Sequence, residues 1–228
     1  MSKSRTDTAT VLEVLVPGLF GPVPLPPELA PETPVLDRIL TRGDALERPG
    51  SDLTTALLAR FGAAASAPYA LAAEPDATEV AAEPSPQQGA FWMHADPVHL
   101  RPDRDQLRLF DTRHLGISRA EADALVAELN AHFGGDGLRF IAPVAARWYL
   151  TTGQPPRLHT QPLEQVIGRS IDGRLPTGPD AEHWASLMNE LQMLLFQSPV
   201  NRAREQQGRP PVNGVWTWGG GEWRQLDE

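Results

Sequence analysis

The residues with the most chemical potential in this sequence lie between positions 94 and 105. Imidazole and carboxylate groups stand close together there, and such groups bind zinc or manganese in proteins. They are His94, Asp96, His99, Asp103 and Asp105. Their spacing matches no defined metal motif, and arginines at 101, 104 and 108 stand among them. The favoured interpretation is an exposed hairpin tip with solvated or paired charges, and a metal site is the alternative.

Ser51 is a second candidate, because it follows Pro49-Gly50 at the start of a predicted helix. The free N–H groups at a helix start favour phosphate, so Ser51 could carry or bind a phosphoryl group. A plain N-cap explains the same residues without any chemistry. The local sequence leaves both interpretations open.

Arginines supply candidate anion anchors, since a guanidinium recognises phosphate through two parallel hydrogen bonds. Arg147, Arg202 and Arg204 are such candidates. The run Gly219–Gly221 could cradle a phosphate, but it matches neither the Walker A spacing nor the dinucleotide fingerprint. A strand over 212–218 that leads into a flexible turn at these glycines is the expected structure.

The elements that must position these residues can be predicted from periodicity. Strands are expected at 10–16, 90–95, 106–110, 138–142 and 146–150, and helices at 33–40, 51–61, from 118, and 180–197. Ser118 and Glu121 form a capping box at the third helix start. Pro199 should end the last helix. The segment 90–150 then reads ββαββ.

The predicted fold class is mixed α/β, with three kinds of region. Residues 1–62 and 160–228 are assigned to a core α/β region, residues 63–89 to an Ala- and Pro-rich surface excursion, and residues 90–159 to an inserted α+β lobe. With 228 residues the chain is long enough to bury a substantial core.

Composition limits the partners that we expect. The formal net charge is -9, which disfavours nucleic acid as a ligand. Val11–Val16 is too short an apolar run for a signal peptide or a membrane span, so we expect a cytoplasmic protein without membrane contact. The chain has no cysteine, which excludes disulfides and thiolate metal sites.

Several motifs, read in order, resemble the archaeal-type cofactor-independent phosphoglycerate mutases of the alkaline phosphatase superfamily. The tail carries most of the resemblance: Leu175-Pro176-x-Gly178, Leu187-Met188, Ser198-Pro199-Val200-Asn201-x-x-Arg204, Gly208-x-x-Pro211-x-Asn213 and Trp216-x-Trp218-Gly219. Ile117-Ser118-x-x-Glu121-Ala122 and Ala145-Ala146-Arg147-Trp148-Tyr149-Leu150 are similar to a helix and a strand of that family's substrate lobe. The resemblance implies a partial alkaline-phosphatase-like core with this lobe inserted.

Near the start, Thr33-Pro34-x-Leu36-Asp37 and Gly50-Ser51-Asp52 resemble the family's first helix and its phosphoserine nucleophile. Pro17 stands where the family has a metal-binding aspartate, and Thr54-Thr55 where a histidine is expected. The remaining ligands follow the Trp-Gly motif in the family by more residues than this chain has. The resemblance therefore implies that no metal and no cofactor is bound and that phosphoryl transfer is absent.

Short bacterial regulatory proteins of the RpfE type (regulation of pathogenicity factors) have a similar layout. The resemblance implies a non-catalytic protein that binds a phosphorylated metabolite, a protein partner or a second copy of itself. Arg101, Arg147 and Arg204 would bind the anion, Asn201 and Asn213 would orient loops around it, and Ser51 would be a vestige or a helix cap.

Two alternatives remain. The first is an active metal-dependent mutase or phosphatase whose metal site has moved to the 94–105 cluster. The second is a pure interaction module in which Val215, Trp216, Trp218 and the helix face around Trp184 form an oligomer surface.

Overall fold

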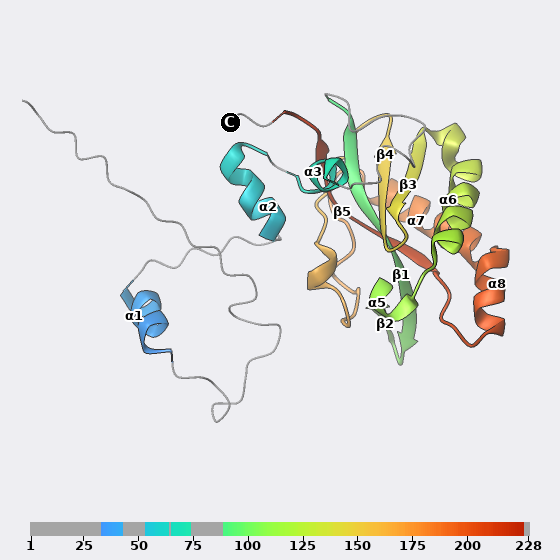
Figure 1. Ribbon diagram of the computed structural model, residues 1–228, viewed down its shortest axis with the longest axis horizontal. Coiled ribbons are helices and arrows are strands. Elements are labelled where there is room, and N and C mark those ends of the chain that lie inside the picture. The colour runs from blue at the N-terminus through green and yellow to red at the C-terminus, as the bar shows by residue number, and fades with distance from the viewer. Residues whose placement is uncertain (1–32, 43–52, 64, 74–88, 226–228) are drawn as a thin grey trace, which may run out of the picture. The chain divides into compact units, whose positions relative to one another are not determined.

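The computed structural model describes residues 33–42, 53–63, 65–73 and 89–225. The chain divides into two compact units, 1–49 and 50–228. In the first unit, the described residues form α1 (Pro34–Arg42), which confirms the predicted helix (Figure 1). The strand predicted at 10–16 and the candidate Ser51 lie outside the described residues.

The second unit contains the predicted ββαββ order. Its elements are β1 (Phe91–Asp103), β2 (Gln106–Phe110), α6 (Arg119–Phe133), β3 (Leu138–Val144) and β4 (Arg147–Thr152). The mixed α/β class is thus confirmed, with antiparallel pairing between β1 and β2, β1 and β4, and β3 and β4.

Strand β1 is longer than predicted. The residues from 96 onward were expected in a charged loop, but they continue the strand to Asp103 and pair with β2. The reason is that the extension is paired along its length: residues 96–98 pair with β5 (Gly214–Glu222), and residues 99–103 pair with β2. Arg104, with φ of 60°, and Asp105 form the turn between β1 and β2.

The pairing of β5 with β1 corrects the predicted domain division. Residues 160–228 were assigned to a core separate from the lobe at 90–159, yet β5 belongs to the same sheet as the lobe. α7 (Ala181–Gln197) packs on this sheet as well. The two stretches therefore fold as one body, in which residues 214–218 of β5 are buried.

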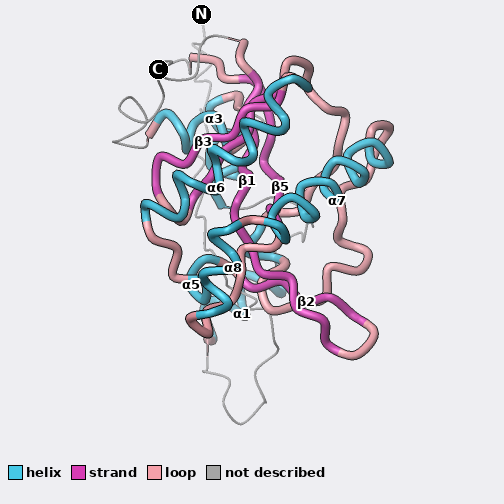
Figure 2. Tube along the Cα trace, turned by 90° about the vertical axis from the view of Figure 1, so that its right-hand side faces the viewer, coloured by secondary structure: helices cyan, strands magenta, loops and turns pink. Residues whose placement is uncertain are grey.

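Three helices cover one face of the sheet: α6, α7 and α8 (Pro199–Gln206). Figure 2 shows them in front of β1 and β5. Their apolar side chains form the largest core cluster with Met93, Phe140, Trp148 and other strand residues. The predicted capping box starts α6, with Glu121 N–H donating to the Ser118 hydroxyl and Ser118 N–H donating to the Glu121 carboxylate. Pro199 ends α7 as predicted, and it also begins α8, which was not predicted.

The opposite face of the sheet has two smaller clusters. α3 (Ala67–Ala72) packs there against Trp92, Ile141 and Tyr149. The segment 163–171, which includes the short η4 (Leu163–Gln165), covers a cluster that includes Trp216 and Trp218. The prediction of a surface excursion at 63–89 is wrong for α3, because Ala67, Pro68 and Leu71 are buried against the sheet.

The three glycines of the tail lie within β5 and not in a flexible turn, so that prediction is wrong. Gly219 has φ of +63°, and a Cβ added to it would lie 2.3 Å from the Ser66 hydroxyl. A Cβ at Gly221 would lie 2.3 Å from Cβ of Ala65. Glycine is needed here because the segment before α3 approaches the β5 backbone closely.

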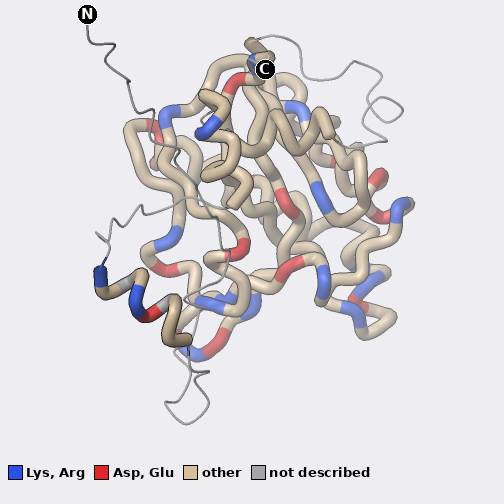
Figure 3. The backbone as a smooth tube through the Cα atoms, turned by 60° about the vertical axis from the view of Figure 1, so that its left-hand side comes forward, with Lys and Arg blue, Asp and Glu red and all other residues tan. Residues whose placement is uncertain are grey.

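The other described helices are short: α2 (Leu53–Leu58), η2 (Ala59–Phe61), α5 (Thr112–Leu115) and η3 (Gly134–Asp136). Basic and acidic positions are interspersed in the view of Figure 3. Within the described ranges, no helix combines the length and the apolar character that crossing a bilayer requires.

Candidate ligand-binding site

The candidate metal ligands at 94–105 are spread along β1 and its turn, where each described contact has a different partner. His99 Nδ1 lies 2.9 Å from the carbonyl oxygen of Pro211, Asp103 forms an ion pair with Arg108, and Asp96 accepts a hydrogen bond on the other face of the strand. Among the residues that the structure describes, no three metal-binding side chains come together. The relocated metal site therefore has no geometric support.

Asp96 is a buried carboxylate, 5% exposed, in the middle of β1. Trp218 Nε1 donates to its Oδ2 at 2.7 Å, and the ring of His94 stacks on that of Trp218 with centroids 4.0 Å apart. Burial, with a smaller effect from the negative charge of Glu164, raises the pKa of Asp96 to about 7, although the hydrogen bond from Trp218 acts to lower it. Asp96 thus changes charge near neutral pH.

Arg147, the first residue of β4, acts on this buried acid. The β1–β4 register pairs His94 with Tyr149, so the next positions along the strands bring Arg147 opposite Asp96. The positive charge of Arg147 lowers the pKa of Asp96, although by less than burial raises it. The exposed guanidinium of this predicted anion anchor therefore lies in the field of a carboxylate.

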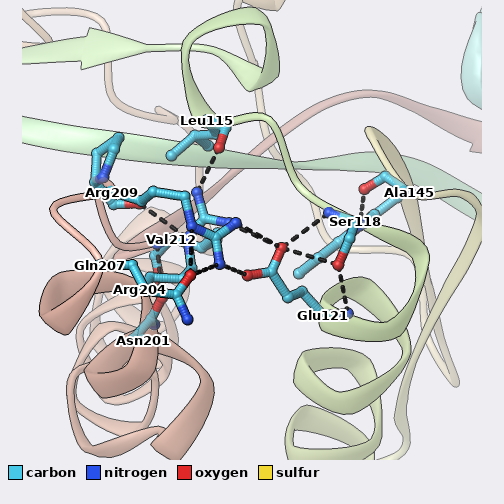
Figure 4. A network of polar contacts seen from close by, with 11 residues as sticks. Leu115, Ser118, Glu121, Ala145, Asn201, Arg204, Gln207, Arg209 and Val212 are labelled. Carbon is cyan, nitrogen blue, oxygen red and sulfur yellow. Dashed lines mark hydrogen bonds and ion pairs between the residues drawn. The ribbon is translucent and has the colours of Figure 1, made fainter.

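Arg204, another predicted anchor, is fully buried with 0% of its side chain exposed. Its three guanidinium nitrogens donate to the carbonyl oxygens of Pro210 and Leu115 and to the Glu121 carboxylate (Figure 4). This network joins α8, the loop after it, the end of α5 and the start of α6. The contacts give Arg204 a structural position without a surface that a ligand could reach.

Glu121 accepts from Arg204 and Arg209 as well as from Ser118 (Figure 4). Burial opposes its ionisation, but the hydrogen bonds from the Ser118 backbone, Arg209 and the Ser118 hydroxyl outweigh that effect and lower the pKa of Glu121 to about 2. The carboxylate is therefore charged at all physiological pH values, which suits a partner of two arginines.

Asn201 and Asn213 hold the loop between α8 and β5. Asn201 Nδ2 donates to the carbonyl oxygens of Leu195 and Val212, and its Oδ1 accepts from Val212 N–H. Asn213 bonds both the N–H and the carbonyl oxygen of Leu100 through its side-chain amide, which continues the β5 ladder along β1. Both residues thus hold this loop in place, and their predicted role around a bound anion stays a prediction.

Arg101 differs from the other two predicted anchors. It is exposed near the end of β1, and its Cζ lies 4.5 Å from the centroid of the Phe110 ring, in a cation–π contact. Among the residues that the structure describes, its guanidinium has no carboxylate partner. The charge of Arg101 is therefore held in place by an aromatic ring and remains available to an anion.

Two histidines contact the same ring. His99 lies across the strand pair from Phe110, with ring centroids 6.5 Å apart, and His114 of α5 meets the ring edge-on at 5.6 Å. The Nδ1 atoms of the two imidazoles contact the Pro211 carbonyl oxygen and the Asp111 carboxylate, respectively. We call His99, Arg101, Phe110 and His114 the Phe110 cluster; His114 and Phe110 were not predicted.

The structure does not bring the three predicted arginines together. Arg101 stands five positions along β1 from Asp96, the residue opposite Arg147, which is about 17 Å at the usual rise of a strand. Successive side chains of a strand alternate faces, so the two arginines also lie on opposite sides. The prediction of one shared anion grip is thus not met, and the Phe110 cluster is the part of it that remains exposed.

The predicted oligomer surface is wrong. Trp184, Val215, Trp216 and Trp218 are each less than 10% exposed and belong to the core of this chain. The indole N–H groups of the tryptophans donate to acceptors within the chain, including Thr217 Oγ1 for Trp184 and the carbonyl oxygen of Gln161 for Trp216. Residues 214–218 of β5 are buried on both faces of the strand. The apolar sequence of this segment does not show whether its side chains face the core or a partner.

Two adjoining hollows lie beside α7. One, of about 210 Å³, is lined mainly by apolar side chains of β1, β2, β5 and the 171–176 segment. The other, of about 600 Å³, is more open and is lined by Asn189, Gln192, Met193, Phe196, Gln197 and Asn213. This surface was not predicted, although the helical spacing of residues 189, 192, 193 and 196 places them on the side of α7 away from its core positions.

Comparison with known proteins gives a consistent family. The model of the family described as 2,3-bisphosphoglycerate-independent phosphoglycerate mutase matches residues 82–201. A probable 2,3-bisphosphoglycerate-independent phosphoglycerate mutase from Geobacter sulfurreducens is 31% identical over 213 residues, which cover 90% of this chain and 52% of the relative. The Methanosarcina mazei protein of that name is 27% identical over 84% of this chain and 49% of its own length.

Among solved structures, a cofactor-independent phosphoglycerate mutase from Thermoplasma acidophilum is similar with a TM-score of 0.47 and 17% identity, over 76% of this chain and 47% of that one. The chain spans about half the length of the relatives that it matches.

Proposed function

The chain belongs to the family of 2,3-bisphosphoglycerate-independent phosphoglycerate mutases, and from this starting point we propose that it is a non-catalytic, regulatory member that binds a phosphorylated small molecule. Two features support the loss of catalysis. Pro17 stands where the resemblance expects a metal-binding aspartate, and the acids of β1 have separate partners rather than a common focus. The regulatory role rests on the resemblance to proteins of the RpfE type.

The Phe110 cluster carries the ligand-binding part of the proposal. Fixing an exposed arginine side chain in one conformation costs side-chain entropy. For Arg101 the cation–π contact with the Phe110 ring offsets this cost. A guanidinium fixed in this way can donate two parallel hydrogen bonds to a phosphate without losing further side-chain entropy. In a chain of net charge -9, this local positive charge also attracts an anion to one place.

The imidazoles of His99 and His114 extend the possible contacts of a bound ester. When neutral, a ring whose Nδ1–H donates to the Pro211 carbonyl oxygen or to the Asp111 carboxylate presents Nε2 as an acceptor. An acceptor beside a phosphate-binding arginine suits a ligand that has both a phosphate and a hydroxyl group. The proposed ligand class is therefore the small hydroxylated phosphate monoesters.

Calorimetric titration with 3-phosphoglycerate and with inorganic phosphate tests this proposal. We expect Arg101→Gln to weaken the binding of 3-phosphoglycerate by roughly tenfold to a hundredfold, the range for a hydrogen-bonded charge worth about 1.5–3 kcal/mol. Arg139→Gln is the matched control, because Arg139 is an exposed strand arginine of β3 and should leave the affinity unchanged. Binding that survives Arg101→Gln at full strength, or no binding to the unaltered chain, would refute the proposed site.

A further inference from the structure

The buried guanidinium of Arg204 contacts the backbone of both segments that support the histidines of the Phe110 cluster. Its Nη2 donates to the carbonyl oxygen of Leu115, the residue that follows His114 at the end of α5 (Figure 4). A helix of four residues has little stability of its own, so an outside bond to its last residue matters. The backbone beside His114 is thus held by α8.

The second contact supports His99 through a pair of prolines. Arg204 Nε donates to the carbonyl oxygen of Pro210 at 2.9 Å, and the carbonyl oxygen of the next residue, Pro211, lies 2.9 Å from His99 Nδ1. The peptide bond between the prolines is planar and the ring of Pro211 fixes φ, so few rotations separate the two carbonyl groups. The N–H that follows Pro211 donates to Asn201 Oδ1. The acceptor of His99 is therefore held from α8 as well.

This support decides which ring nitrogen of each histidine carries a hydrogen. A carbonyl oxygen and a carboxylate accept hydrogen bonds, so Nδ1 is the donor both in His99, which contacts Pro211, and in His114, which contacts Asp111. In a neutral ring Nε2 is then the acceptor, and this is the atom that the proposed function assigns to a hydroxyl group of the ligand. An imidazole without a fixed partner has both tautomers available.

We propose that Arg204 is a positioning residue for the Phe110 cluster, because it fixes the backbone that holds both imidazoles with Nε2 as the acceptor. The inference rests on the proposed function, since it concerns the ligand site proposed there. Arg204 acts through backbone and not on the ligand, because its side chain is fully buried. Its own place is fixed by Glu121, whose Oε2 accepts from Nη1 at 3.0 Å.

Arg209 offers a matched control for Arg204. Its guanidinium also pairs with Glu121, at 2.7 Å, and its other described side-chain contacts are with Gln207. The two arginines thus share one carboxylate, but the side chain of Arg204 also bonds the backbone that supports the histidines. Substitution by lysine keeps the positive charge at either position and replaces the planar set of donors with a single ammonium group.

Long-range ¹H–¹⁵N NMR spectra of the imidazoles, recorded without ligand at about pH 8, where imidazole is usually neutral, test the inference. In the unaltered chain and in Arg209→Lys, we expect His99 and His114 to show the Nδ1–H tautomer alone. In Arg204→Lys both should show a mixture of tautomers, because one ammonium group cannot reach three separate acceptors. His132, which pairs with a glutamate of α7, should give the same spectrum in all three proteins.

Calorimetric titration with 3-phosphoglycerate links the tautomers to binding. We expect Arg204→Lys to weaken the affinity by roughly threefold to tenfold, about the loss of one neutral hydrogen bond, and Arg209→Lys to leave it unchanged. If the unaltered chain does not bind, the proposed function fails, whereas the spectra still decide whether Arg204 positions the histidines. If it binds and Arg204→Lys binds equally well, only the present inference fails.

Three spectral results would overturn the inference: Nε2–H at either histidine of the unaltered chain, unchanged tautomers in Arg204→Lys, or an equal change in Arg209→Lys. If circular dichroism shows that Arg204→Lys does not fold, Pro211→Gly decides instead. This substitution keeps Arg204 but frees the φ angle between the two carbonyl groups. The spectrum of His99 should then change while that of His114 does not, and any other pattern rejects the proposal.

Discussion

Asp96 and Glu121 are acidic side chains whose surroundings shift their pKa in opposite directions. Burial dominates at Asp96 and raises its pKa to about 7. Glu121 is also partly buried, but donors from Ser118, Arg209 and Arg204 lower its pKa to about 2. Stability should therefore depend on pH in opposite ways at the two sites, because the folded state holds its proton more tightly at Asp96 and less tightly at Glu121.

Asp96→Asn should make the chain more stable above neutral pH. The pKa of Asp96 in the folded state lies above the ordinary value of 3.8, so the folded state binds more protons and stability falls as pH rises from about 4 to about 7. An amide can still accept from Trp218 but does not ionise. Urea unfolding should show a gain on the order of a few kcal/mol at pH 8 and little difference at pH 4. An equal pH dependence in both proteins would contradict this assignment.

Glu121→Gln should destabilise the chain at neutral pH by about 3 kcal/mol, the cost of leaving a buried guanidinium without its counter-charge. The contribution of the native carboxylate is present above its ordinary pKa of 4.5 and is lost as pH falls toward 2. The variant should therefore lack this acid-sensitive part of stability in urea unfolding.

Asp123→Asn is the control for Glu121→Gln, because Asp123 forms an exposed pair with Arg119 at one helical turn. Such a pair contributes about 1 kcal/mol or less. If both substitutions cost the same, the network around Arg204 does not have the structural importance that its contacts indicate.

At the scale of elements, residues with a local signal were predicted well. The capping box located the start of α6, and the helical recurrence from Trp184 to Leu195 located α7. Elements that depend on distant partners were missed. The extension of β1 depends on pairing with β5 more than a hundred residues away, and α3 is core only because the sheet covers it.

Gly221→Ala tests the close approach between β5 and the segment before α3. The added Cβ would lie 2.3 Å from Cβ of Ala65, so backbone must move, and overpacking of this kind costs about 1–3 kcal/mol. Hydrogen exchange of the α3 amides should accelerate, because the packing of α3 against the sheet is weakened. Gly135→Ala is the control, since nothing lies within 4 Å of its added Cβ, and it should leave both stability and exchange nearly unchanged.

At the scale of the whole molecule, the sheet contains strands from both ends of the stretch 89–225. The exposed surfaces of this body were the hardest feature to predict. Arg101 was predicted to bind an anion, but in one site together with Arg147 and Arg204. Residue type reveals a possible anion anchor, whereas the strand face and the neighbours decide whether the anchor is exposed. For the same reason the tail tryptophans were taken for surface, while Met193 and Phe196 were overlooked.

We propose above all that this member of the mutase family binds a phosphorylated ligand without transforming it. The most direct test is to incubate the full chain with 3-phosphoglycerate and Mn²⁺ and to measure 2-phosphoglycerate. The metal is then removed with a chelator, and the phosphate esters are identified by phosphorus NMR. We expect only the starting ester, as in a protein-free control. Accumulation of 2-phosphoglycerate in proportion to the amount of protein, and its loss in Ser51→Ala, would contradict the account.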